Sequence, residues 1–400
     1  VMIVNKVLSL AKGLEDPKHP LLGPNLKALS KVGLFLPTRS FKNDIIKFFY
    51  YFLGLAAPSL FLELWIVRDN LTEMLNNISV TGLGLICEYK HLCFIYWTPY
   101  WNELYEGISK EEIKEISNND KNVVSAMKKY TTYARIVTYL YWVLVIITNA
   151  TMIITPFLRY GLSASYREEI RNGTEPYPVV MSCWLPFDKT KMSGYTISLV
   201  IQIILNIIGG SIVALFDSNV FAIMTFFKGQ MIILREKCGS LFDDNASDLR
   251  VLERIKECHR HHNFLLKYHK LFNSLVSPPM FCYVLVCSVT ICCSVVQLTL
   301  DESTLTQKLW LTEYTLALVT QLFLYCWYSN EILIESKAMD RGVYNSNWWR
   351  SDMRTRRHIL LLAGKLDRSF VCTAGPFACL SVATFTEILF IPEFPRKLSN

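Results

Sequence analysis

The residues with the most evident chemistry in this sequence are ionisable side chains inside long apolar runs. Glu88, Lys90 and His91 fall in the middle of one such run, and Asp217 falls in another. An ionisable side chain at the centre of a lipid bilayer costs roughly 2.5 to 3.5 kcal/mol, so such residues face protein or water. We expect either an aqueous or ligand cavity beside the first run or a partner charge such as Arg135.

A second reactive group is the segment Cys258-His-Arg-His-His262, with His269 close by in the sequence. Imidazole and thiolate groups are good zinc ligands. However, residues 258, 259, 261 and 262 do not share one face of a helix, and no second Cys/His pair follows at zinc-finger spacing. We therefore expect no metal site. Histidine protonation near neutral pH would make an interface at this segment sensitive to pH.

The elements that carry these residues belong to a membrane protein. Of the 400 residues, 52% are hydrophobic and 19% charged, and the mean hydropathy is +0.26, which is too apolar for a water-soluble protein. The net charge is +7, but the basic residues are confined to certain loops, so we expect no binding of nucleic acid. The sequence has no glycine-rich phosphate loop, no Gly-x-Ser-x-Gly and no His-Glu-x-x-His. We expect neither an enzyme nor a cofactor.

Seven apolar runs are long enough to cross a membrane as helices, since a crossing takes about 20 residues with every backbone group paired. They cover residues 45–67, 74–97, 136–158, 196–227, 278–298, 309–334 and, less cleanly, 370–390. The predicted fold class is therefore an all-α membrane protein with seven transmembrane helices.

The distribution of Lys and Arg predicts how these helices are oriented, because positive residues are retained on the cytoplasmic side. The N-terminal segment and every second loop carry about three times as many of them as the alternate loops. We expect a cytoplasmic N-terminus and an extracellular C-terminus, with the sequon at Asn172 glycosylated outside the cell. A G-protein-coupled receptor has the opposite orientation, and its acidic-Arg-Tyr and Asn-Pro-x-x-Tyr motifs are not found at the ends of the third and seventh runs.

Helices are also predicted outside the bilayer, after the fourth run. Apolar residues recur there near helical spacing with charged residues between them, at Leu249, Leu252, Ile255, Leu265, Leu266 and Leu271. Such a stripe is stable when something packs on it. The helices that project into the cytoplasm therefore pair with each other or form a subunit interface.

The last third of the chain carries specific motifs. They are Tyr325-Cys-Trp-Tyr-Ser-Asn-Glu331, Glu335-Ser336, Val343-Tyr344, Asn347-Trp-Trp349, Thr373-Ala-Gly375, Leu380-Ser381 and Thr384-Phe-Thr-Glu-Ile-Leu389. This string resembles the C-terminal signature of the insect odorant receptor family. The segment 260–266 and the acidic residue Asp217 are similar to elements of the same family. In the gustatory branch the last helix starts with Thr-Tyr and ends with Gln-Phe, whereas Thr384 is followed here by Phe385.

The resemblance implies an odour-gated, non-selective cation channel, a hetero-tetramer with a co-receptor, in the dendritic plasma membrane of an olfactory sensory neuron. It implies a cytoplasmic segment (1–44), a ligand-binding bundle of four helices (45–227), anchor helices (228–277), two further crossings (278–334), an anchor segment (335–369) and a seventh pore helix with its tail (370–400). The anchor residues are His262, Tyr344 and Trp348, and the pore residues are Thr384, Phe385, Ile388 and Leu389. The alternatives are a G-protein-coupled or a gustatory-type chemoreceptor.

The ligand that the resemblance implies is a small volatile organic molecule, bound in an apolar pocket among the second, third, fourth and sixth helices. Dispersion and desolvation then supply most of the affinity. The residues at suitable depth are Leu85, Glu88, Asn149, Met152, Gln202, Asn206, Tyr314 and Leu318.

The tail departs from the family pattern. Pro392 and Pro395 remove helical hydrogen bonds, and the 12 residues from Leu380 to Ile391 are too few to span a bilayer. We expect either that the seventh crossing begins earlier, near Phe370, or that the pore end is truncated in this sequence.

Overall fold

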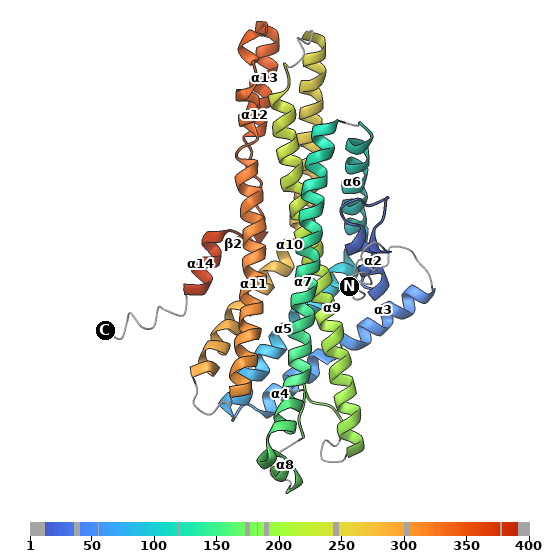
Figure 1. Cartoon of the computed structure of the whole chain (residues 1–400), viewed down its shortest axis with the longest axis vertical. Coiled ribbons are helices and arrows are strands. Elements are labelled where there is room, and N and C mark those ends of the chain that lie inside the picture. The colour runs from blue at the N-terminus through green and yellow to red at the C-terminus, as the bar shows by residue number, and fades with distance from the viewer. Residues whose placement is uncertain are drawn as a thin grey trace, which may run out of the picture.

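The computed structural model describes residues 13–35, 41–54, 56–118, 120–172, 177–181, 183–187, 192–242, 248–299, 305–376 and 378–390. Long helices run side by side along the molecule (Figure 1). In chain order the elements are α2 (Gly23–Val32), α3 (Phe41–Gly54), α4 (Ala56–Ile66), α5 (Leu71–Tyr96), α6 (Thr98–Ser117), α7 (Lys121–Leu162), α8 (Ala164–Arg171), α9 (Met192–Gly239), α10 (Asp248–Thr299), α11 (Leu305–Ser336), α12 (Asp340–Asn345), η2 (Trp348–Arg350), α13 (Met353–Leu366), β1 (Thr373–Ala374), β2 (Ala378–Cys379) and α14 (Val382–Phe390).

The helices coincide with six of the predicted crossings. The runs 74–97, 136–158, 196–227, 278–298 and 309–334 lie in α5, α7, α9, α10 and α11, and the run 45–67 is divided between α3 and α4. Among the described residues, α5, α7, α9 and α10 are long and apolar enough by themselves to cross a membrane.

The seventh run differs from the expectation of a helix from Phe370. Its first half is a short hairpin in which β1 pairs antiparallel with β2, with Thr373 opposite Cys379. Gly375 adopts a φ of 66° in the turn, a conformation that glycine tolerates and other residues rarely adopt. The helix α14 begins at Val382 and has 9 residues. Pro392 and Pro395 lie outside the described residues.

The helices α9 and α10 are continuous from the apolar region into the extension, with 48 and 52 residues. Pro278 and Pro279 lie inside α10 without ending it. The core follows α9, whose residues between Leu215 and Leu234 are almost all buried, and α7 and α11 pack along it. The extension, at the upper end of Figure 1, gathers α6, α12 and α13 around these long helices, so the segments after the fourth run are helical as predicted.

Candidate functional site

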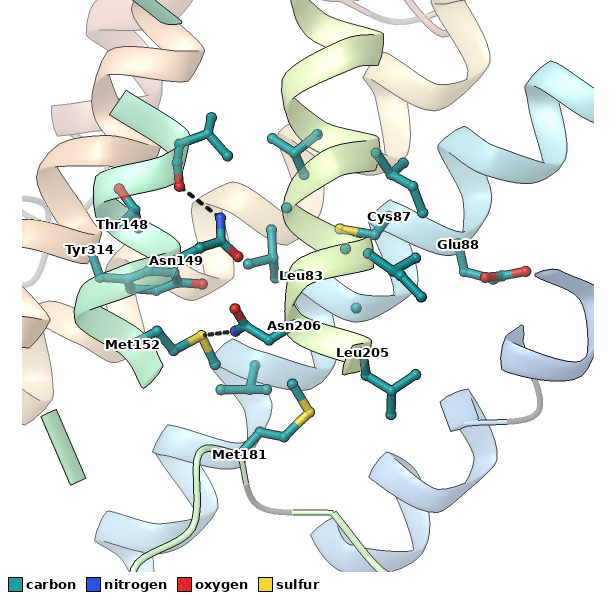
Figure 2. Close-up of a pocket in the computed structure, with 18 of the residues that line it drawn as sticks. Leu83, Cys87, Glu88, Thr148, Asn149, Met152, Met181, Leu205, Asn206 and Tyr314 are labelled. Atoms are coloured by element: carbon teal, nitrogen blue, oxygen red, sulfur yellow. Dashed lines mark hydrogen bonds between the residues drawn. The ribbon is translucent and has the colours of Figure 1, made fainter. Parts of the chain in front are cut away.

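A cavity of about 190 Å³ lies between α5, α7, α9 and α11, and the loop residues Met181 and Cys183 close one side of it (Figure 2). By this measure it has room for roughly a dozen or more water molecules. Its walls are mainly apolar, formed by residues such as Leu60, Leu83, Val145, Ile208, Val213 and Ala317. An apolar cavity with few polar groups is typical of a site for a small organic ligand.

Helix α5 contributes one face to the cavity, through Val80, Leu83, Gly84, Cys87 and Glu88. These positions follow the three- and four-residue spacing of a single helical face. Leu85 points away from that face and does not line the cavity, so its prediction as a pocket residue is wrong.

Glu88 lines the cavity as predicted, but it lies at the edge. Figure 2 shows its carboxyl group pointing away from Asn149 and Asn206. A methyl group placed on Gly54 of α3 would lie 2.7 Å from Glu88 Oε1, which puts the carboxyl group against the end of that helix. The carboxyl group therefore belongs to the rim between α3 and α5.

The predicted residues of α7 and α9 meet in the cavity. Asn149 Nδ2 donates to the carbonyl of Val145 at 2.7 Å, and Asn206 Nδ2 donates to Met152 Sδ at 2.8 Å. Figure 2 shows these side chains directed into the space between the helices. The structure thus brings Asn149, Met152 and Asn206 together, as the sequence predicted.

Gln202 lies one helical turn before Asn206 and has a different role from the one predicted. It is fully buried and does not line the cavity. Its Oε1 accepts hydrogen bonds from the backbone N–H groups of Val180 at 3.0 Å and Met181 at 3.3 Å. Gln202 therefore holds the loop that closes the cavity, and the loop residue Met181 is a lining residue that sequence reasoning missed.

Helix α11 supplies the opposite wall. Tyr314 and Leu318 line the cavity as predicted, together with Gln321 one turn further along. The hydroxyl group of Tyr314 donates to the carbonyl of Ser79 at 3.5 Å, which places its ring between α11 and α5. Gln321 was missed, although it follows Leu318 at the spacing of one helical face.

A buried charged cluster adjoins the cavity. Lys90 Nζ lies 2.6 Å from Asp217 Oδ1, and Tyr141 donates to Asp217 Oδ2 at 2.7 Å. Gln321 and Tyr325 also donate to this carboxylate. Tyr141 and Gln321 line the cavity as well, so the cluster forms part of its wall.

The expectation that Arg135 serves as a partner charge for the second crossing is wrong. Arg135 instead bonds to Glu15 at 2.6 Å and to the carbonyl of Leu21 at 2.8 Å. The sequence expectation left a cavity and a partner charge as alternatives for the ionisable residues of α5. Both occur, because Glu88 lines the cavity and Lys90 has the partner Asp217.

His261, His262 and His269 of α10 lie outside the apolar run 278–298 and are buried. His261 bonds to Gln230 Oε1 at 3.0 Å, and the rings of His262 and His269 lie 6.0 and 5.0 Å from that of Phe370. Burial lowers the pKa of His261 to about 3 and the pKa values of His262 and His269 to about 4. The expected pH sensitivity near neutrality is therefore wrong for these histidines. Within the described ranges no three His, Cys, Asp or Glu side chains are grouped to hold a metal.

The other predicted residues lie away from the cavity. Thr384 donates to the carbonyl of Cys379 at 2.7 Å at the start of α14, and the ring of Phe385 lies 5.4 Å from Phe323 of α11. Ile388 and Leu389 pack in part on the same core. At the extension, Tyr344 is exposed and Trp348 is half-buried in η2, while the exposed Asn172 ends α8.

A second hollow of about 820 Å³ lies between α7, α9 and α11 in the extension. Its lining includes the charged residues Lys129, Lys228, Glu236, Lys237 and Glu331. A polar, charged wall suits an apolar ligand poorly, because covering charges without pairing them is costly. The cavity among α5, α7, α9 and α11 is the better candidate for a small-molecule site.

A family model described as 7tm Odorant receptor matches residues 70–390. Odorant receptor 46a, isoform B, of Drosophila melanogaster is 25% identical over 44% of this chain and 47% of its own length. Odorant receptor Or2 of Anopheles gambiae is 22% identical over 38% and 40%, and Odorant receptor 10 of Aedes albopictus is 23% identical over 72% and 74%. The chain thus spans about half or less of the first two relatives.

The fold is similar to that of a solved receptor. The olfactory receptor OR5 of Machilis hrabei in complex with eugenol aligns with a TM-score of 0.78 and 14% identity, over 96% of this chain and 100% of the other. A second structure of that receptor aligns with a TM-score of 0.74 over 91% and 95%. At this identity the likeness concerns the seven-helix fold alone.

Proposed function

This chain belongs to the seven-transmembrane odorant receptor family, and on that premise we propose that it binds small volatile molecules in the cavity among α5, α7, α9 and α11. The observation that carries the proposal is the cavity itself, mainly apolar, with amide and phenol groups at a few points of its wall. A small volatile ligand in such a cavity gains affinity chiefly from desolvation and close packing. The eugenol complex of the Machilis hrabei receptor supports a ligand of this general kind.

We further propose that ligand binding opens a non-selective cation path in a hetero-tetramer with a co-receptor. The short helix α14 contributes Thr384, Phe385, Ile388 and Leu389 to the pore. A link between ligand binding and the pore is supported by the contact of Phe385 with Phe323, which lies in α11. The same helix lines the cavity through Tyr314 and Leu318. A shift of α11 on ligand binding would then be transmitted to α14.

The extension is proposed as the anchor between subunits, with His262, Tyr344 and Trp348 in or beside it. Its support is the apolar outer face of α13, where Met353, Leu360 and Leu361 are exposed within this chain. Exposed apolar surface of this kind is typical of a protein interface. His262 supports the anchor from inside, since it packs beside Phe370.

The proposed location is the dendritic plasma membrane of an olfactory sensory neuron, with the N-terminus in the cytoplasm and Asn172 glycosylated outside. The asymmetric distribution of Lys and Arg supports this orientation. An epitope tag at Val1 tests it in intact cells. Staining only after permeabilisation is expected, whereas staining of unpermeabilised cells would favour the orientation of a G-protein-coupled receptor.

The function is tested by expressing the chain with a co-receptor and recording currents during application of a panel of volatile molecules. We expect Leu318→Trp to abolish the responses, because the larger ring fills the cavity. Leu316→Trp is the matched control, since Leu316 lies on the same helix but is 65% exposed. Loss of response in the first variant alone supports the proposal, provided that both reach the cell surface equally. Equal responses from both variants would contradict the proposed site.

A further inference from the structure

The polar groups of the cavity wall point to one chemical class of ligand. We infer that the site selects small apolar molecules that carry a hydrogen-bond donor, such as an alcohol or a phenol, over acceptor-only ethers, esters and ketones of the same shape. This inference rests on the proposed function and deepens it. It follows from which of the wall's donors and acceptors are already used within the protein.

The orientation of two carboxamides is determined by the chemistry of their partners. Asn149 Nδ2 donates to the carbonyl oxygen of Val145, which accepts and cannot donate. Gln321 Nε2 donates to the carboxylate of Asp217, which is held by Lys90. In both residues one of the two N–H groups of the amide is thus used within the protein, whereas the amide oxygen accepts no hydrogen bond among the described residues.

Asn206 is oriented in the same way. Its Nδ2 contacts Met152 Sδ at 2.8 Å, and a thioether sulfur is a weak acceptor with no proton to donate. The Asn206 Oδ1 atom is buried and has no hydrogen-bond partner among the described residues. A buried carbonyl oxygen without a partner is costly, so a donor brought by a ligand would stabilise the complex.

The phenol donors of the wall are also used. The hydroxyl group of Tyr141 donates to Asp217 at 2.7 Å, and that of Tyr314 donates to the carbonyl of Ser79 at 3.5 Å. The amide nitrogen of Gln202 has no partner in the part of the chain that the structure describes, but Gln202 does not line the cavity. The amides and phenols of the wall thus present oxygen acceptors to a ligand.

The amides of Asn149 and Asn206 come from the neighbouring helices α7 and α9, and both line the cavity. A methyl group placed on Gly210 would lie 2.5 Å from Asn149 Oδ1, so the Asn149 amide rests on α9 at Gly210. Gly210 follows Asn206 by four residues, a rise of roughly 6 Å along the helix. Figure 2 shows both side chains directed into the same part of the cavity. A single hydroxyl group placed between α7 and α9 can donate to either oxygen.

The test uses three ligands with one carbon skeleton, namely a phenylalkanol, its methyl ether and the parent hydrocarbon, applied to the chain expressed with a co-receptor. One hydrogen bond to a buried acceptor corresponds to roughly a 5- to 10-fold change in potency. We expect the half-maximal concentration of the alcohol to be lower than that of the ether by about this factor. If no volatile molecule elicits current, the proposed function fails. If currents occur and the ether is as potent as the alcohol, this inference alone fails.

A variant then assigns the preference to the proposed oxygens. Asn149→Leu keeps the branched shape of the side chain and removes the oxygen, so the ratio of ether to alcohol half-maximal concentrations should fall toward one while the ether still activates. Leu205→Ala is the control, because it removes apolar surface from the same cavity and should weaken both ligands alike. If the ratio of ether to alcohol half-maximal concentrations is unchanged both in Asn149→Leu and in Asn206→Leu, the inference is overturned.

Discussion

Lys90 of α5 and Asp217 of α9 form an ion pair with 2.6 Å between Nζ and Oδ1, and neither side chain is exposed. Tyr141 of α7 and both Gln321 and Tyr325 of α11 also donate to the carboxylate. Four helices thus converge on one buried carboxylate, and two of its partners also form cavity wall. A ligand that displaces Tyr141 or Gln321 would disturb the hydrogen bonds that hold these helices together.

Removing one member of this pair is expected to be strongly destabilising. Lys90→Met leaves the Asp217 carboxylate buried without a counter-ion, which costs about 3 to 5 kcal/mol. The double variant Lys90→Met, Asp217→Asn removes both charges and should recover part of that loss. Thermal unfolding of the detergent-solubilised protein measures both effects. If the loss in the double variant equals the sum of the losses in Lys90→Met and Asp217→Asn, the two charges are not coupled.

Gly210→Ala is expected to disturb the ligand site through Asn149. The new methyl group would lie 2.3 Å from Asn149 Nδ2, so the amide must move and its hydrogen bond to Val145 must lengthen. We expect potency for an alcohol ligand to fall about 5- to 10-fold, the value of one hydrogen bond. The neighbouring Gly209→Ala is the control, because its methyl group meets Cys87 Sγ at an ordinary 3.9 Å. Dose–response curves check both variants, and equal shifts would contradict the role of Gly210.

The helices were predictable because their apolar runs are long, and a bilayer leaves few alternatives to a helix. The run 370–390 was misjudged because Gly375 and Pro376 form a turn, a local signal that average hydropathy does not register. Leu85 lies at the same depth along α5 as the lining residues but on a different face of the helix, so depth alone did not predict its position. The spacing of Val80, Gly84 and Glu88 would have excluded it.

Contacts between distant segments were beyond the sequence. The partnership of Lys90 with Asp217 joins residues 127 positions apart, and nothing local distinguishes Asp217 from Arg135 or another charge as a partner. The role of Gln202 depends on a loop about 20 residues before it, since its oxygen accepts from Val180 and Met181. Periodicity reports which face of a helix is apolar, but it does not report which polar group a buried amide meets.

Glu112 in α6 predicts a dependence of stability on pH. Burial raises its pKa to about 7, although the backbone N–H of Leu21 and the hydroxyl group of Tyr130 donate to it and Arg135 is near. A raised carboxyl pKa means that the folded state binds the proton more tightly than the unfolded state. The resulting stability is fully present below pH 4.5, the ordinary value, and is lost as pH rises through about 7.

The expected loss is on the order of 3 kcal/mol between these limits. Glu112→Gln cannot ionise, so the melting temperature should change less between pH 5 and pH 8 than in the unchanged protein. Glu106→Gln is the control on the same helix, because the Glu106 side chain is 53% exposed. If the melting temperature of Glu112→Gln changes as much between pH 5 and pH 8 as that of the unchanged protein, Glu112 is not the group responsible.

The hairpin before α14 is expected to depend on α10. Asn273 Oδ1 accepts from the backbone N–H of Thr373 at 2.9 Å, and Asn273 Nδ2 donates to Thr373 Oγ1 at 3.1 Å. The backbone N–H of Gly375 donates to Ser277 Oγ at 2.9 Å. Asn273→Ala removes two of these bonds, which are worth about 1 kcal/mol each.

We therefore expect Asn273→Ala to speed amide hydrogen exchange in residues 372–380 by roughly 30-fold, since about 2 kcal/mol of local stability is lost. Ser274→Ala is the matched control, because the Ser274 hydroxyl donates to Leu271 within the same helix. Peak current should fall in Asn273→Ala with little change in half-maximal concentration, because the hairpin is bonded to α10, leads into α14 and lies outside the ligand cavity. A shift in ligand potency with unchanged exchange would mean that Asn273 acts on the cavity instead of the hairpin.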